Sequence, residues 1–584
     1  MKLKKFFIYD LPAVRQGSLF IILFIATILR LYKLGSIPSH LTPDEASLGY
    51  NAFSILKTGR DEYGKVLPII FKSFGDYKPG LYVYLTVPFV AILGLTEFAV
   101  RLPGALAGIV AVWLVYRVVE ILSLRFTSLQ NDKKTSGSSF IVHRSLALLS
   151  AFFLAISPWH IHFSRGAWEV NVALTLTLAG VFFFLKALKQ QKFLYYSATF
   201  FALTLVTYQG AKLSTAIVLL ILTITYWKEV LCFEKMVLAK SILVGLAISL
   251  PILTSLFSGK TGRLAVFSAF SYQRPREYLQ IFLDQGQEEI GGLNYYLFHS
   301  ESYNFARVIM AKFFNHFSGR FLFFEGDWQN LRHTAPNHGV LLLSDLLFLT
   351  AGFVALIRLG WKKRTRFLWL WLFLAPLPAV LSRDQVHAVR AYNLVVPLTI
   401  ISSLGLGQVF NFIQKIKKPI LHTICHTLLL ASLLGAIIFY LDSYFIHVPI
   451  HDAKYWHYGY KQIVQVVNPI QDKYENIKVQ QSYSQPYIYF LFYGGDGKGY
   501  DPARYQEQSK LQESLVGDVG LVQKLDNIDF VRFSWPYATG QSGTLVAGDY
   551  NAIPSYYSTK EYDLISEIKY PDNISTAFRI LEVK

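Results

Sequence analysis

Long apolar runs alternate with short polar segments as far as about residue 441. A bilayer core about 30 Å thick needs about 20 mainly apolar residues in an α-helix, so runs near this length predict membrane-spanning helices. One further apolar run, 81–97, is ambiguous. The predicted spans are residues 17–33, 101–122, 145–158, 171–187, 193–208, 213–227, 238–257, 339–359, 366–382, 391–411 and 419–441.

The basic segments between the spans determine how the run 81–97 is interpreted. Cytoplasmic loops collect Lys and Arg, and four connecting segments are basic: "KKTSGSSFIVHR", "KALKQQK", "LIRLGWKKRTR" and "QKIKKP". If 81–97 crossed the membrane, the first of these would lie outside. We therefore predict a re-entrant or membrane-edge helix there and about 11–13 spans in all; a further crossing compensated elsewhere is the alternative. The N-terminal tail "MKLKKFFIYDLPAVRQ" shows no cleavable signal peptide and is predicted to be cytoplasmic.

Three segments then share the outer side of the membrane. They are the loop 34–100, the loop 258–338 with the amphipathic stretch "YNFARVIMAKFFNHF", and the tail 442–584. The tail is polar and shows β-like runs such as "NIDFVRFSW", "GTLVAGDYNAI" and "TAFRILEV". The predicted fold is mainly α: a polytopic transmembrane bundle over residues 1–441, followed by a small extracytoplasmic α/β domain over 442–584.

Composition supports an integral protein of the cytoplasmic (plasma) membrane. Hydrophobic residues make up 53% of the 584 positions and charged residues only 16%, below the roughly 25% of soluble domains. The net charge of +18 follows from the positive-inside rule, so no nucleic-acid partner is implied. Two cysteines do not form a disulfide framework.

Two adjacent carboxylates follow the first predicted span. Asp44 and Glu45 lie in "HLTPDEASLGYNAF" at the outer membrane edge. A buried carboxylate that lies within hydrogen-bond reach of a hydroxyl can act as a general base. The alternative is an exposed loop pair with no chemical role.

A lysine lies at a predicted helix start in the same loop. "FKSFGDYKPGLYVY" contains Asp76, Tyr77 and Lys78, and Pro79 suits the first turn of the next helix. An ammonium beside a helix N-terminus favours an anion. The alternative is that Lys78 reaches to lipid headgroups.

Polar side chains also gather in "SPWHIHFSRGAWEVNVAL", an external turn between two spans. It contains His160, His162, Arg165 and Glu169, with Glu169 at the next helix start. The His-x-His pair with Glu169 has the residue types of a metal site, although interfacial histidines are the more usual explanation.

Three more external turns carry cations. Together they are predicted to surround a few carboxylates with basic side chains, an arrangement that suits binding of a phosphate-bearing amphiphile. The turns are "TYQGAKLS" with Tyr208, Gln209 and Lys212, "SRDQVHAVRAYN" with Arg383, His387 and Arg390, and "NLRHTAPNHG" with Arg332, His333 and His338.

The order of the segments is itself informative. One span is followed by "TPDEASLGYNA", "DYKPGLYVYL", "EFAVRLPGALAGIVAVWLVYRV" and "LAISPWHIHFSRGAWEVNVALTL". This order resembles the membrane-embedded glycosyltransferases of the C-type superfamily, family 39, which includes protein O-mannosyltransferases and aminoarabinose lipid A transferases. The likeness covers about residues 15–260 and is looser through "HAVRAYNLVVPL".

The resemblance implies roles for individual residues. Asp44 corresponds to the family's catalytic carboxylate, with Glu45 beside it, and Lys78 with Pro79 to the Lys-Pro that contacts the donor phosphate. Arg165 and Glu169 match an Arg-acid pair, although the acid is more often Asp. We assign catalysis to Asp44, Glu45 and Glu169, donor phosphate binding to Lys78, Arg165, Lys212 and Arg390, and substrate binding to Asp76, Tyr77 and His387.

The resemblance also implies a reaction. A polyprenyl-phosphate-linked sugar enters from the lipid bilayer and is transferred, with inversion, to a protein, lipid or polysaccharide acceptor outside. No nucleotide-binding fingerprint is evident in the sequence. The resemblance implies no certain cofactor. Whether the reaction needs a divalent cation stays open, because the superfamily contains members with and without one. The alternative is a lipid or saccharide transporter or flippase, which would carry its charges nearer the membrane midplane.

Overall fold

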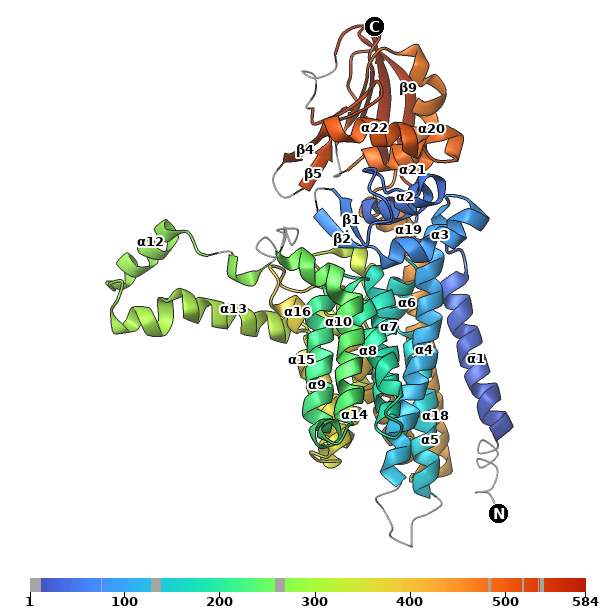
Figure 1. Ribbon diagram of the computed structural model, residues 1–584, viewed down its shortest axis with the longest axis vertical. Coiled ribbons are helices and arrows are strands. Elements are labelled where there is room, and N and C mark those ends of the chain that lie inside the picture. Colours follow the sequence, from blue (N-terminus) through green and yellow to red (C-terminus); the bar gives the residue numbers. More distant parts are fainter. Residues whose placement is uncertain are drawn as a thin grey trace.

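The computed structural model describes residues 12–74, 76–127, 138–257, 268–271, 273–481, 485–516, 519–533, 535 and 540–584. A helical bundle forms one end of the molecule, and a sheet-containing domain with the C-terminus forms the other (Figure 1). Most of the predicted N-terminal tail (residues 1–11) and part of the first basic segment (128–137) lie outside the described ranges.

Helices occupy all eleven segments that the apolar pattern predicts as spans. By length and composition, six helical stretches in the described ranges can each cross a membrane, or seven if α5 and α6, bent by 58°, form one span. The chain is therefore an integral membrane protein, while the larger number of spans stays a prediction. The helices are α1 (Pro12–Leu31), α4 (Glu97–Thr127), α5 (Ser138–Ile156), α6 (Pro158–Ser164), α7 (Glu169–Ala187), α8 (Phe193–Leu205), α9 (Ala211–Leu231), α10 (Lys235–Phe257), α14 (Asp345–Arg358), α15 (Lys363–Leu374), α16 (Leu377–Val380), α17 (Val395–Gln414) and α18 (Pro419–Asp442).

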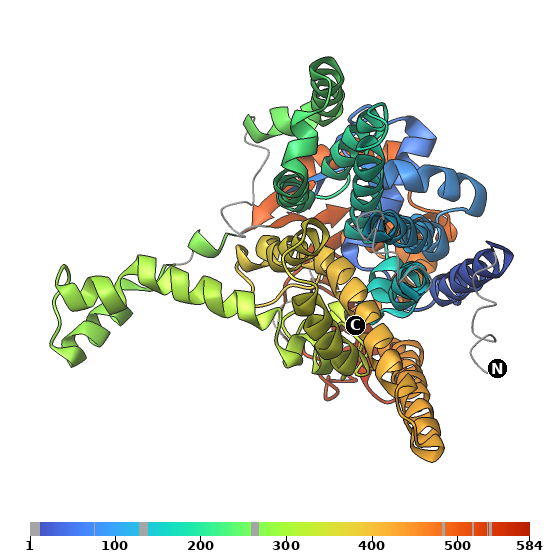
Figure 2. The same ribbon diagram turned by 90° about the horizontal axis from the view of Figure 1, so that it is seen from below.

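The helices differ in how deeply the bundle buries them. In the span Glu169–Ala187 of α7, 83% of the apolar 18-residue window is buried, whereas in the span Lys235–Ser255 of α10 the share is 17%. Figure 2 shows α18 at the edge of the bundle, where apolar side chains such as Leu428 and Ile438 are exposed. Exposed apolar side chains on peripheral spans are what lipid contact requires. The central helix α7 carries Glu169 at its first turn.

Hydrogen bonds bring several basic connections to one end of the bundle. The backbone N–H of Glu234, between α9 and α10, donates to Oε1 of Gln191, between α7 and α8 (2.9 Å). Lys363, at the start of α15, forms an ion pair with Glu229 near the end of α9. The first residues of α1 lie at this same end, opposite the C-terminal domain (Figure 1).

The ambiguous apolar run forms α3 (Leu81–Leu93), which begins and ends at the other end of the bundle. The N–H of Leu81 donates to the carbonyl of Val206, in the α8–α9 turn (3.0 Å). Glu97, just after α3, pairs with Lys461 of the C-terminal domain (2.5 Å). Because both ends of α3 lie on one side, the predicted membrane-edge helix is confirmed. The same loop contains α2 (Pro43–Thr58), β1 (Ile70–Ser73) and β2 (Asp76–Pro79).

The C-terminal domain is built on a six-stranded mixed sheet in the order β6-β7-β3-β8-β10-β9. The central strand β3 pairs parallel with β7 and β8, and β10 pairs antiparallel with β8 and β9. The predicted β-like runs correspond to β7, β8 and β10, so the α/β domain is confirmed. Its elements are α19 (Val448–His451), α20 (Tyr460–Val467), β3 (Ile477–Gln480), α21 (Tyr487–Gly497), α22 (Pro502–Gln512), the β4–β5 hairpin (Glu513–Val516, Val519–Val522), β6 (Lys524–Leu525), β7 (Ile528–Val531), β8 (Leu545–Asp549), β9 (Tyr562–Lys569) and β10 (Thr576–Val583).

The first loop and the C-terminal domain share one hydrophobic core. Tyr489 of α21 donates from its hydroxyl to the carbonyl of Leu41 (3.0 Å). A Cβ on Gly49 would lie 2.6 Å from the ring of Phe492 and 2.5 Å from Val100, so glycine permits the close approach of α2 to both neighbours. The helix that carries Asp44 and Glu45 is therefore held between the bundle and the domain.

A lateral arm extends sideways from the upper part of the bundle, below the C-terminal domain (Figures 1 and 2). It consists mainly of α12 (Arg276–Gly286) and α13 (Glu301–Asn315), and α13 contains most of the predicted amphipathic stretch. Lys312 anchors α13 to the bundle by donating to the carbonyl of Ser382 (2.7 Å). Short 3-10 and π segments complete the described fold: η2 (Ala269–Ser271), η3 (Tyr295–His299), η4 (Arg320–Phe324), η5 (Leu331–His333), η6 (Tyr392–Leu394), η7 (Ser443–His447) and η8 (Asn468–Lys473).

Candidate active site

The sequence "TPDE" builds the start of α2 and separates its two carboxylates. Thr42 is the N-cap and accepts from the N–H of Glu45 (3.3 Å), while Glu45 accepts from the N–H of Thr42 (2.9 Å). This reciprocal capping box satisfies two N–H groups at the helix start. Glu45 is thereby turned inward with a side chain 3% exposed, whereas the side chain of Asp44 stays 46% exposed.

Asp44 lies in a group of charged and polar residues that we name the Asp44 cluster: Asp44, Lys78, Glu169, Arg332 and His457. The β1–β2 hairpin positions Lys78, whose ammonium forms an ion pair with the Asp44 carboxylate. Burial alone would raise the pKa of Asp44, but the charges of Lys78 and Arg332 hold it below its ordinary value. Asp44 is therefore an ionised carboxylate at neutral pH.

Lys78 stands between several carboxylates. Burial lowers its pKa, but Asp44, Glu169 and Asp76 outweigh burial and raise the pKa of Lys78 above its ordinary value. Its ammonium also lies 5.2 Å from the ring centre of Phe74. The residues predicted for the base and for donor phosphate binding, Asp44 and Lys78, are thus in direct contact, with Glu169 in the same electrostatic neighbourhood.

Two members of the cluster come from distant segments. The carbonyl of Arg332, in the segment between α13 and α14, accepts a bond from Nε2 of His162 (2.8 Å), which fixes the backbone at Arg332. His457 lies after the last span, and burial lowers its pKa to about 3, so its imidazole is neutral. The cluster therefore requires the first loop, the long external segment and the C-terminal domain to be assembled together.

Glu45 belongs to a different set, the anchor cluster, formed by Glu45, Arg101 and Arg165. Oε1 of Glu45 accepts from Nε of Arg101 (3.0 Å) and from the N–H of Ala167 (2.9 Å). Arg101 is fully buried and also donates to the carbonyl of His40 (2.7 Å). This geometry favours the interpretation that Glu45 holds the loop in place over direct catalysis.

Arg165 also binds backbone rather than the Asp44 cluster. Its guanidinium donates to the carbonyls of Leu29 (2.9 Å) and Tyr32 (2.7 Å) at the end of α1. The carbonyls at a helix C-terminus lack partners within the helix, and a cation satisfies them. The structure therefore does not bring Arg165 to Asp44, and its predicted contact with a donor phosphate has no support from this geometry.

The two histidines before Arg165 face different partners. Nδ1 of His160 lies 2.6 Å from the guanidinium of Arg30, whereas Nε2 of His162 donates to the carbonyl of Arg332. Neither contact includes Glu169. A shared metal site for His160, His162 and Glu169 is thus not favoured by this arrangement.

Asp76, Tyr77 and Lys212 meet through Gln209. The side-chain amide of Gln209 donates to the carbonyl of Tyr77, and its oxygen accepts from the ammonium of Lys212 (2.7 Å). Oδ1 of Asp76 accepts from the N–H of Tyr77 (2.8 Å). These contacts fix β2, and with it Lys78, against the turn between α8 and α9.

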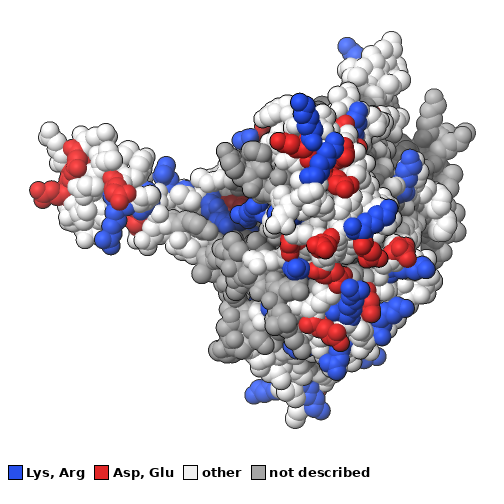
Figure 3. Space-filling model, turned by 90° about the horizontal axis from the view of Figure 1, so that it is seen from above, with Lys and Arg blue, Asp and Glu red and all other residues white. Residues whose placement is uncertain are grey.

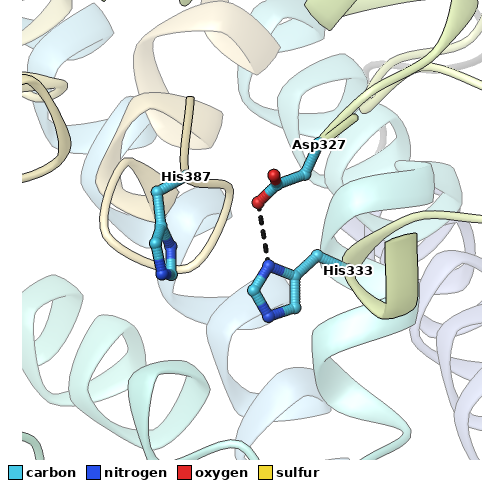
Figure 4. A group of neighbouring side chains, drawn as sticks. All are labelled: Asp327, His333 and His387. Atoms are coloured by element: carbon cyan, nitrogen blue, oxygen red, sulfur yellow. Dashed lines mark hydrogen bonds and ion pairs between the residues drawn. The ribbon is translucent and has the colours of Figure 1, made fainter. Parts of the chain in front are cut away.

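His387 and Arg390 lie in a neighbouring polar group. Oδ2 of Asp327 accepts from Nδ1 of His333 and from the N–H of Ala388, each at 2.8 Å. His387 lies beside this pair (Figure 4), with its ring centre 5.2 Å from that of His333. Arg390 pairs with Asp384 (2.8 Å) and acts electrostatically on Tyr208, whose pKa burial raises to about 12.

Within the described ranges, Asp327, His333 and His387 are the residues whose ligand atoms converge enough to hold a metal, within 4.8 Å of one another. Burial lowers the pKa of both histidines, at His333 despite the opposing effect of Asp327, and neutral imidazoles can bind metals. However, Asn330 donates two more bonds to Asp327, both to Oδ1 (3.1 Å). With four donors the carboxylate is fully satisfied. The group fits a hydrogen-bonded support for the turn better than a metal centre.

Four of the five residues of the Asp44 cluster are singled out by the sequence. Asp44, Lys78 and Glu169 have predicted roles there, whereas Arg332 has none. Arg332 stands in a turn noted for its cations, but nothing there assigned it to Asp44. His457 lies in "YWHYGY", an aromatic stretch with no catalytic pattern, and Asp327 has no motif around it. Only proximity in the folded chain distinguishes these residues.

Comparison with known structures defines the class of fold. The fold resembles that of the solved ArnT structures, and the resemblance noted from the order of the motifs is confirmed at the level of the fold. No protein-family model matches the sequence, and no curated protein matches it.

Two of the similar solved structures are of ArnT from Cupriavidus metallidurans. The apo form aligns with 97% of this chain and 98% of its own, at 12% identity and a TM-score of 0.51. The form bound to undecaprenyl phosphate gives the same coverage and TM-score at 11% identity. The archaeal oligosaccharyltransferase AglB from Archaeoglobus fulgidus aligns with 82% of this chain and 63% of its own, at 12% identity and a TM-score of 0.44.

Proposed function

We propose that this protein is a membrane glycosyltransferase that moves a sugar from a polyprenyl-phosphate carrier to an acceptor on the outer side of the membrane. The observation that carries the proposal is the contact between the half-exposed Asp44 and Lys78, with Arg332 and Glu169 beside them. A base and a set of phosphate-binding cations are the two elements that such a transfer needs. The ArnT structure that contains undecaprenyl phosphate supports a lipid-linked donor.

In this proposal Asp44 acts as general base. The acceptor hydroxyl or amine attacks the anomeric carbon, and the new bond forms as the bond from that carbon to the phosphate oxygen breaks on the opposite face. Asp44 takes the acceptor proton, and the polyprenyl phosphate leaves with the electron pair. Attack opposite the leaving group inverts the anomeric configuration.

Lys78 and Arg332 stabilise the departing phosphate. The guanidinium of Arg332 acts on Asp44 through space, and an arginine presents a fork of donors that matches phosphate oxygens. Binding of the donor draws Lys78 from Asp44 toward the phosphate, which frees a carboxylate oxygen for the acceptor. Glu169, Asp76 and Tyr77 border this position and contribute to substrate binding.

The proposed orientation places the Asp44 cluster and both termini relative to the membrane. The connections between α7 and α8, and between α14 and α15, carry the basic segments and lie at the end opposite the C-terminal domain. By the positive-inside rule that end faces the cytoplasm. The N-terminus is then cytoplasmic and residues 442–584 are extracytoplasmic, in the cytoplasmic membrane.

Labelling of single cysteines tests this orientation. In a variant with Cys232→Ser and Cys425→Ser, Gln190→Cys is expected to resist a membrane-impermeant maleimide in intact cells, and exposed Tyr556→Cys to react. Labelling of position 190 from outside, with position 556 protected, reverses the orientation.

Transfer of a radiolabelled sugar from polyprenyl phosphate tests the activity. Membranes with the wild-type chain are expected to label an endogenous acceptor, and Asp44→Asn at equal expression is expected to abolish the labelling. Asp284→Asn, on the exposed arm helix α12, is the matched control and keeps it. Movement of the labelled lipid across the bilayer without transfer, undiminished in Asp44→Asn, indicates the transporter alternative.

A further inference from the structure

The C-terminal domain contains a pocket of about 670 Å³ that the proposed chemistry does not use. Its lining includes His451, Lys454, Tyr550, Tyr570, Asp572 and Arg579. A volume of this size accommodates a small ligand. The lining shares no residue with the Asp44 cluster, so the pocket is a separate binding position.

One wall of the pocket adjoins the Asp44 cluster through a single turn of backbone. Lys454 lines the pocket, and its carbonyl accepts from the N–H of His457 (3.2 Å), while Tyr458 donates to the carbonyl of Ala453 (3.0 Å). The Asp44 carboxylate in turn acts electrostatically on His457. A ligand in the pocket therefore lies one chain turn away from His457, a member of the Asp44 cluster.

Arg579, one of the lining residues, is held by hydrogen bonds, and a carboxylate balances its charge. Arg579 is 8% exposed, and it donates to the carbonyl of Ile553 (2.6 Å) and to Glu567 (3.1 Å). Because Glu567 neutralises this guanidinium, the charges left on the lining are those of Lys454 and Asp572, which oppose each other. The pocket thus offers both donors and acceptors without a net charge that would select an ion.

Aromatic faces complete the lining. Tyr550 is 55% exposed, and Tyr570 packs against Tyr458 with ring centres 6.0 Å apart, which restrains its ring. Flat aromatic surface packs against the C–H faces of pyranose rings, and hydroxyls need donors and acceptors together. On the outer face of the domain seen in Figure 3, basic and acidic side chains are interspersed rather than segregated, which does not favour a polyanion.

We propose that this pocket binds a short, uncharged saccharide that forms part of the acceptor. The inference rests on the proposed function, since it assigns the pocket to the acceptor of that reaction. Binding there holds the acceptor beside the turn Lys454–Tyr458 and presents its reacting group toward Asp44. The chemical class of the acceptor is then a glycan or a glycan-bearing molecule.

Direct binding tests the pocket without any transfer. The fluorescently labelled full chain in detergent is applied to an array of neutral and acidic glycans, together with Tyr550→Ala, Lys454→Ala and Asp44→Asn. Wild type and Asp44→Asn are expected to bind the same neutral glycans, and both pocket variants to bind them at least tenfold more weakly. Tyr556→Ala is the matched control, because Tyr556 is 82% exposed and does not line the pocket.

Each contrary outcome rejects a definite part of the inference. If no neutral glycan binds, or only polyanionic glycans bind, the ligand class is wrong. If the pocket variants bind as wild type does, the location is wrong. If binding depends on Asp44 and not on Tyr550 and Lys454, the glycan occupies the Asp44 cluster instead. None of these results depends on transfer activity, so they are distinguishable from failure of the proposed function.

Discussion

Asp44 and Glu45 are neighbours in the sequence, yet they belong to regions with opposite physical character. The Asp44 cluster keeps its carboxylate 46% exposed and in contact with a single ammonium. The anchor cluster surrounds a carboxylate that is 3% exposed with two N–H groups and a fully buried arginine. Spare hydrogen-bonding capacity at the first site is available for a substrate, whereas at the second it is used by the protein.

The difference follows from helix geometry. Successive residues of a helix point about 100° apart, so a capping box that turns Glu45 inward leaves Asp44 on another face. Two carboxylates that are adjacent in the sequence, Asp44 and Glu45, therefore do not form one functional unit. If this distinction is correct, the two positions respond to substitution in different measurements.

Asp44→Asn is expected to produce the largest loss of activity. Removing a general base costs about 10²- to 10⁴-fold in rate, so the transfer rate falls by about 10³-fold. The melting temperature in detergent falls much less than in Glu45→Gln, because Asp44 is half-exposed and Lys78 keeps Glu169 and Asp76 nearby. A transfer rate equal to that of wild type at equal expression would falsify the assignment of the base.

Glu45→Gln is expected to lower stability instead. It leaves the buried guanidinium of Arg101 without its counter-ion, which costs about 3–5 kcal/mol. The expected signs are a lower melting temperature and poor recovery from size-exclusion chromatography. The double variant Glu45→Gln with Arg101→Met removes both charges and is expected to recover part of the loss. A melting temperature unchanged in Glu45→Gln contradicts the anchor role.

Lys78→Met and Arg332→Met sharpen the comparison on the donor side. Each removes one cation proposed to hold the phosphate, and loss of such a group costs about 10²-fold in kcat/KM for the donor. Lys65→Met, in the same loop but exposed, is the control and keeps the wild-type value. An unchanged kcat/KM for both test variants means that other groups hold the donor.

The pH dependence of kcat/KM is expected to show the smallest effect, but it tests the contact between Lys78 and Asp44 most specifically. In the proposed mechanism Asp44 acts as the ionised base, and Lys78 and Arg332 hold its pKa below the ordinary value, so the acid limb of kcat/KM is expected below about pH 4. In Lys78→Met the burial that raises this pKa is no longer opposed by the ammonium, and the limb moves to higher pH by about one unit. A limb that stays in place shows that Lys78 does not tune Asp44.

Much of the architecture could be predicted because the bilayer restricts what an apolar run can form. Each predicted span became a helix, and the basic segments predicted that α3 stays at the membrane edge. The strand runs in the C-terminal domain were visible through their spacing and turn residues. The number of crossings could not be settled in this way, since helices such as α8 and α3 are short.

The candidate site was only half visible in the sequence. The order of motifs pointed to Asp44, Lys78 and Glu169, and these residues lie together. Arg165 and Glu45 have the residue types of a site but bind the protein itself, which depends on which carbonyls and N–H groups happen to face them. The sequence around Arg165 and Glu45 does not indicate which distant backbone groups these side chains bind.

The sequence by itself determined the helices, the edge helix and the capping box that divides Asp44 from Glu45, because hydrophobic length and local hydrogen bonding act within a few residues. Only the tertiary structure decided that Arg332 and His457 join Asp44, and that Arg165 caps α1. Electrostatic and hydrogen-bond partners are selected by distance in space. The packing of the first loop against the C-terminal domain sets those distances, and residues more than 400 positions apart create them.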